Sequence, residues 1–112
     1  MIIKRVQELP EQSNPHGVSA KLAYDSPHAM AVHLTLQPGE ALKRHITPVD
    51  VFFYVLEGEG IVEIGEESET VQADMLIESP ARIPHRLRNE GSSRFRVLVL
   101  KVPRPTESTR LL

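Results

Sequence analysis

The sequence contains no cysteine. A disulfide bond, a thiolate nucleophile and a cysteine-ligated zinc site are therefore all excluded. The chain also lacks a long hydrophobic run, because neither its first ten residues nor any later segment has the apolar length of a signal peptide or a membrane span. We therefore expect a soluble, cytoplasmic protein.

An excess of positive charge is missing as well. The chain carries 13 Lys and Arg against 15 Asp and Glu, which gives a formal net charge of −2 at pH 7. This balance provides no general attraction to nucleic acids or to anionic membrane surfaces, so neither is expected as a partner. With 112 residues, 40% hydrophobic and 25% charged, the chain has the length and composition of one globular domain.

Short apolar segments alternate with turn residues along the chain, and no long helical period is present. Apolar residues alternate with polar or small ones over residues 18–24 and 30–36, the pattern of half-buried β-strands. Residues 51–56 are continuously apolar, which indicates a strand covered on both faces. Further strands are expected at residues 2–6, 61–64, around 71, 75–77, 83–89 and 95–102. Many short strands at close spacing predict an all-β sandwich or barrel.

The first of two spaced motifs begins at Gly39 and ends at Gly58. His45 follows Gly39 after five residues. In its spacing the motif resembles the first signature of the cupin family, small β-barrels that often hold a metal between histidines. The family's second histidine and its glutamate fall here on Thr47 and Val51.

The second motif contains Pro80, His85 and Asn89 at the spacing of the family's second signature. The two glycine positions of that signature hold Asp74 and Arg82 instead. The resemblance is therefore strong in spacing and incomplete at the positions that would form the site.

The resemblance implies an all-β cupin double-stranded β-helix, a jelly-roll-like barrel, over residues 1–103. The segment after Val102 contains two prolines, Pro103 and Pro105, and has few apolar residues to bury. We therefore expect residues 104–112 to form a tail that is flexible or packed on a neighbour. The outer face of the strand at 51–56 is apolar and needs cover. Small cupins are commonly dimers, so we expect a homodimer.

Strand alternation predicts which side chains line the barrel interior. His45 shares a face with Lys43 and Thr47, and His85 shares a face with Leu87. If the two motif strands close a barrel, His45 and His85 face each other across its interior, which is just wide enough for one small ligand. We therefore predict a ligand pocket lined by Lys43, His45, Thr47, Val51, Phe53, Val55, Arg82, His85 and Leu87.

The family's metal is commonly held by three histidines and a carboxylate, or by two histidines and a carboxylate. Here Thr47 offers only a neutral hydroxyl and Val51 only methyl groups. His45 and His85 remain as candidate ligands for a zinc, iron, nickel or manganese ion, and two imidazoles alone hold a metal weakly. Asp50 is a candidate replacement carboxylate, although strand alternation points it away from the interior.

Three functions stay open on the sequence. The leading interpretation is a small-molecule-binding cupin domain with weak or absent metal binding. The alternative is a metal-dependent cupin enzyme of the dioxygenase or isomerase type that uses His45 and His85. A metal-free variant of such chemistry would use a histidine base oriented by Asp50 or Glu78. The third interpretation is a structural interaction module, which requires a barrel filled by its own side chains.

Overall fold

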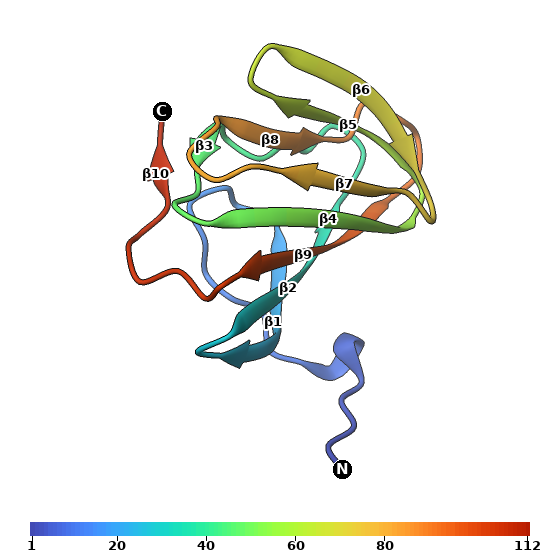
Figure 1. Ribbon diagram of the computed structural model, residues 1–112. Helices are drawn as coiled ribbons and strands as arrows, with labels where there is room; N and C mark the ends of the chain where they lie inside the picture. Colours follow the sequence, from blue (N-terminus) through green and yellow to red (C-terminus); the bar gives the residue numbers. More distant parts are fainter.

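The computed structural model describes residues 1–112 and shows two antiparallel β-sheets packed face to face as a barrel (Figure 1). The elements are the 3-10 helix Val6–Glu8 and strands β1 (Ser19–Ser26), β2 (Ala29–Leu36), β3 (His45–Ile46), β4 (Asp50–Glu57), β5 (Glu59–Ile64), β6 (Glu67–Gln72), β7 (Leu76–Ser79), β8 (His85–Arg88), β9 (Phe95–Val102) and β10 (Arg110–Leu111). One sheet has the strand order β1-β2-β9-β4-β7 and the other the order β10-β3-β8-β5-β6. The predicted all-β double-stranded β-helix is confirmed.

The hydrophobic core lies between the sheets because alternate side chains of each strand point inward. In β4 the buried residues are Val51, Phe53 and Val55, which alternate with more exposed neighbours. Val97 and Val99 occupy the corresponding inner positions of β9, directly opposite Val55 and Phe53 in the ladder. These inner faces belong to one cluster of buried apolar residues that both sheets supply.

The outer face of β4 is less covered than its continuous apolar run predicts. Phe52 and Tyr54 are only half-buried, and Leu56 is exposed. The amino-terminal segment does not cover them, since residues 2–6 form no strand. The predicted strand at residues 2–6 was wrong, because this segment pairs with no sheet edge. Its contact with the sheet is made by the Lys4 ammonium, which donates to the Ala23 carbonyl. The homodimer that would cover this face stays a prediction.

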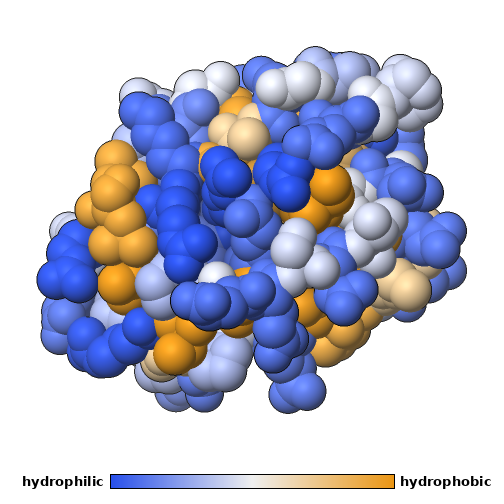
Figure 2. All heavy atoms as spheres, turned by 90° about the horizontal axis from the view of Figure 1, so that it is seen from above, coloured by the Kyte–Doolittle hydropathy of each residue, from blue (hydrophilic) through white to orange (hydrophobic).

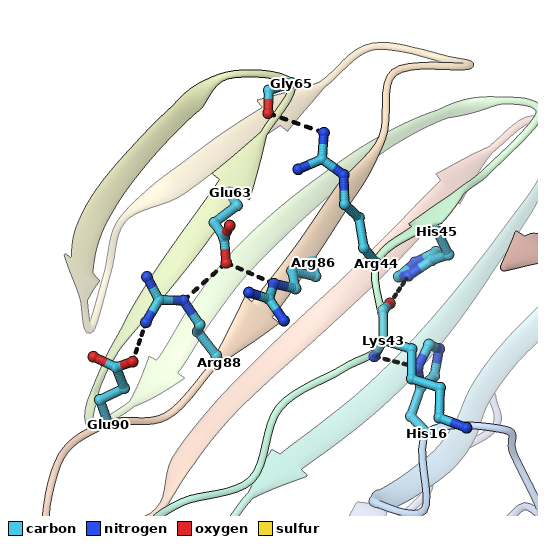
Figure 3. A network of polar contacts seen from close by, with 9 residues as sticks. All are labelled: His16, Lys43, Arg44, His45, Glu63, Gly65, Arg86, Arg88 and Glu90. Carbon is cyan, nitrogen blue, oxygen red and sulfur yellow. Dashed lines mark hydrogen bonds and ion pairs between the residues drawn. The ribbon is translucent and has the colours of Figure 1, made fainter. Parts of the chain in front are cut away.

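Charged side chains cover the outer face of the opposite sheet. Glu63 on β5 accepts from Nε of Arg86 at 2.6 Å and from Nε of Arg88 at 2.8 Å, while Arg88 also pairs with Glu90 (Figure 3). Seen from above, this side of the molecule is mostly hydrophilic, with its hydrophobic residues in separate patches (Figure 2). The arginines of β8 therefore serve the surface, and the alternate residues of the same strand, His85 and Leu87, face inward.

Both family glycine positions that hold other residues keep a glycine-like backbone. Asp74 has φ 69° and Arg82 has φ 66°, values that glycine adopts without strain. The Arg82 amide donates to the Thr47 carbonyl at 2.9 Å, which ties this turn to the chain after β3. The turn is therefore preserved although its usual residue is absent, and β8 starts only after it, at His85.

The carboxy-terminal segment completes one edge of the second sheet. Strand β10 lies against β3, with Leu111 opposite His45 and Arg110 opposite Ile46 (Figure 1). Residues 104–112, which the sequence analysis assigned to a tail outside the barrel, thus add the short strand β10 to the second sheet. The structure contains no helix with the length and hydrophobicity that a membrane span requires.

Candidate functional site

A cavity of about 240 Å³ lies between the two sheets. Its apolar walls come mainly from the inner faces of the sheets. Five of the predicted pocket residues line it, namely His45, Thr47, Val51, Phe53 and His85. The structure therefore brings both motif histidines to one cavity.

The other four predicted pocket residues lie elsewhere. Val55 and Leu87 face inward but are fully buried in the core beyond the cavity. Lys43 is exposed because β3 begins only at His45, so strand alternation does not extend back to residue 43, and Leu42 turns inward in its place. The Arg82 side chain points to solvent, where its guanidinium lies 3.7 Å from the Glu107 carboxylate.

His45 and His85 meet as neighbours within one sheet. Strands β3 and β8 pair antiparallel with these two residues directly opposite, and their ring centroids are 4.6 Å apart in an edge-to-face arrangement. The sequence predicted that they would face each other across the barrel interior. The structure instead places both on the same wall, because β3 and β8 are adjacent strands.

Both ring nitrogens of His85 are occupied by hydroxyl groups. Nδ1 lies 2.6 Å from Ser79 Oγ, and Nε2 lies 3.0 Å from Thr47 Oγ1. A hydroxyl can donate or accept, so either neutral tautomer of the imidazole is fully hydrogen-bonded. Burial, reinforced by the charges of His45 and Lys101, lowers the pKa of His85 to about 3. At neutral pH this side chain is therefore an uncharged, satisfied group.

His45 and His16 hold the peptide backbone at Lys43 from both sides (Figure 3). His45 Nδ1 donates to the Lys43 carbonyl at 2.7 Å, which leaves its Nε2 without a proton in the neutral ring. His16 Nδ1 accepts the Lys43 amide at 2.8 Å, so its Nε2 carries the proton. Burial lowers the pKa of His45. The pKa of His16 is lowered to about 4, first by burial and then by the charges of His45 and Lys43.

These two hydrogen bonds give the cavity a defined donor and a defined acceptor. His16 Nε2–H and His45 Nε2 have no partner in the protein, and both residues line the cavity. Their rings are 4.9 Å apart between centroids. A ligand in the cavity can therefore accept from His16 and donate to His45.

Lys101 is a further basic residue of the cavity wall. It follows Val97 and Val99 on the inward side of β9 and lies opposite Val51 of β4. Its ammonium makes no hydrogen bond or ion pair within the chain, and burial lowers the pKa of Lys101. An unpaired ammonium beside apolar walls is costly, so Lys101 is a basic group of the cavity that the protein itself leaves without a counter-charge.

The residues present do not fit the family's metal site. His85 has both nitrogens in hydrogen bonds, Val51 offers no donor, and none of the cavity-lining residues is acidic. No three His, Asp or Glu side chains converge as a set of metal ligands. The Asp50 carboxylate is exposed and accepts the Ala81 amide at 2.8 Å, and Glu78 is exposed on β7. Neither acid reaches a histidine, so the cavity has neither a carboxylate ligand for a metal nor an acid that orients a histidine base.

Sequence reasoning missed His16 and Lys101. A signal for Lys101 was present, since it continues the alternation of Val97 and Val99. His16 gives no such signal because it lies in an irregular loop. It reaches the cavity through a backbone contact 27 residues away in the chain, which no local pattern reveals.

The family model for the cupin domain matches residues 32–101, more than half of the chain. The crystal structure of TT1209 from Thermus thermophilus is 35% identical, covers 94% of this chain and 100% of that one, and gives a TM-score of 0.81. A search of curated proteins found no significant match.

More distant solved structures share the fold. The polyketide cyclase RemF from Streptomyces resistomycificus is 16% identical over 100% of this chain and 85% of that one, with a TM-score of 0.86. KdgF from Halomonas sp. is 23% identical over 88% of this chain and 92% of that one, with a TM-score of 0.78. At these identities the likeness concerns the fold, and one fold carries many unrelated activities.

Proposed function

The chain belongs to the cupin family, and we propose that its barrel is a binding domain for a small organic molecule and needs no resident metal. The observation that carries the proposal is the cavity of about 240 Å³ whose apolar walls carry unpaired polar groups of His16, His45 and Lys101. Apolar walls with a few oriented polar groups are the usual composition of a small-molecule site.

The volume limits the size of the ligand. Pockets for drug-sized ligands measure roughly 300–1,000 Å³, so this cavity is smaller than most of them. At the packing density of protein interiors it accommodates a molecule of about ten non-hydrogen atoms. The phenyl face of Phe53 and the aliphatic side chains of Leu22 and Val99 provide apolar contact for such a molecule.

Thr47 and Val51 replace the family's ligands in a way that favours binding without a metal. Thr47 is 2% exposed and hydrogen-bonds His85, so it stabilises the imidazole that a metal would otherwise hold in place. Val51 contributes apolar wall at the position of the family's glutamate. The substitutions thus form a consistent set, because each replaces a metal ligand by a group that the cavity uses.

A fragment screen by ¹H–¹⁵N NMR tests the proposed function. We expect uncharged and anionic fragments of this size to shift the amide signals of cavity residues such as Phe53 and Val99. Leu22→Trp, which fills part of the cavity, should abolish these shifts while signals of the outer β5–β6 hairpin stay in place. Shifts that persist in Leu22→Trp, or that never involve cavity residues, would contradict the proposal.

A further inference from the structure

The charge of the cavity is one-sided. His16, His45, His85 and Lys101 line it, and no aspartate or glutamate does. Outside the cavity, several arginines of the sheets and their ends have an acidic partner: a glutamate or an aspartate pairs with each of Arg86, Arg88, Arg94, Arg96 and Arg104. The chain has more acidic than basic residues, yet it leaves this one interior site without a counter-charge.

Lys101 is the source of the positive charge at neutral pH. Burial keeps the neighbouring histidines neutral by lowering their pKa values, and the Lys101 ammonium itself contributes to that effect on His16, His45 and His85. Lys101 and the three histidines line the same cavity. A partly buried cation without a partner is stabilised most by an anion that shares its low-dielectric surroundings.

We propose that the cavity selects a small monocarboxylic acid with an apolar body and that the ammonium of Lys101 anchors its carboxylate. This inference rests on the proposed function and names its ligand class. One ammonium balances one negative charge, and the His16 Nε2–H supplies a donor for a second carboxylate interaction. The apolar body then packs against Phe53, Leu34 and Val99, which are buried wall residues.

A carboxylate fits this cavity better than a phosphate. Phosphate sites in proteins use several backbone amides or arginine side chains to balance a larger charge. No arginine lines this cavity, and its walls are mainly apolar. The apolar cavity therefore suits a ligand with one negative charge, which the single ammonium of Lys101 balances.

Titration with phenylacetate and with its uncharged analogue phenylacetamide tests the inference. The two probes have nearly the same shape, so a difference in affinity measures the preference for the charge. We expect phenylacetate to bind at least about tenfold more tightly than phenylacetamide, as a charged hydrogen bond requires. In Lys101→Met this ratio should fall to about one, and in Lys101→Arg it should remain above one.

Lys43→Met is the matched control. It removes the lysine that strand alternation assigned to the pocket but that the structure places in solvent, so the preference for phenylacetate should persist. Lys101→Met removes a partly buried, unpaired charge and retains an apolar stem, so we expect it to fold; its amide spectrum verifies this.

The outcomes separate the inference from the proposed function. Equal affinity for both probes in the unchanged protein, with cavity residues shifted, would overturn the carboxylate preference and leave a binding domain. A preference that survives in Lys101→Met, or that disappears in Lys43→Met, would overturn the role of Lys101. Failure of both probes and of the fragment screen to reach cavity residues would overturn the proposed function as well.

Discussion

Replacing Asn89 by alanine is expected to lower the free energy of unfolding by about 3 kcal/mol or more. The Asn89 amide donates to the carbonyls of Leu36, at 2.9 Å, and Ser93, at 2.8 Å, and its oxygen accepts the Gly91 amide at 2.9 Å. The side chain is 1% exposed, so water cannot replace these bonds. Each buried group left without a partner costs about 1–3 kcal/mol.

Asn89→Asp separates the hydrogen-bond argument from a simple effect of size. Aspartate has almost the same volume, but its carboxylate cannot donate to the Leu36 and Ser93 carbonyls. We therefore expect a loss of stability similar to that of the alanine variant when unfolding is followed in denaturant. A loss below about 1 kcal/mol in both variants would show that Asn89 does not hold this end of β8 in place.

The stability of the protein is expected to fall on mild acidification, and His85 accounts for about 2 kcal/mol of that loss at pH 5. The pKa of His85 is lowered from 6.5 to about 3 in the folded protein, where the residue is 2% exposed. Between these two values the unfolded chain binds a proton that the folded chain does not. The contribution is therefore fully present above the unfolded pKa and is lost progressively as the pH falls below 6.5.

His85→Gln tests this assignment, because glutamine can hydrogen-bond Thr47 and Ser79 but does not titrate. The free energy of unfolding, measured from about pH 7.5 to about pH 5, should decrease by about 2 kcal/mol less in His85→Gln than in the unchanged protein. Burial lowers the pKa values of His16 and His45 as well, so a smaller loss of the same sign should remain. Identical pH profiles for the two proteins would contradict a neutral, buried His85.

The fold was predictable from the sequence because its strands follow a simple period. Apolar residues alternate along β1 and β2, and glycine and proline mark the turns. The motif spacing also identified the two histidines that meet at the cavity. The strand period by itself predicts a sandwich or barrel, and the resemblance of the two motifs to the cupin signatures supplied the double-stranded β-helix and the two histidines.

The parts of the site that escaped prediction depend on where a strand begins and on contacts between distant segments. Lys43 precedes β3, so a rule for strands assigned its side chain to the wrong side. His16 is placed by Asn14, whose side-chain oxygen accepts the His16 amide at 3.0 Å, and by the Lys43 backbone. Thr109 and Leu111 reach the cavity only because β10 pairs with β3.

On the proposed function, hydrogen bonds hold the histidine pair and the cavity stays free for an organic ligand. Elemental mass spectrometry of freshly purified, untagged protein checks this arrangement, beside a variant that carries both His45→Ala and His85→Ala. We predict zinc, iron, nickel and manganese far below one equivalent in both proteins. Near-stoichiometric metal in the unchanged protein that is lost in the double variant would contradict this arrangement.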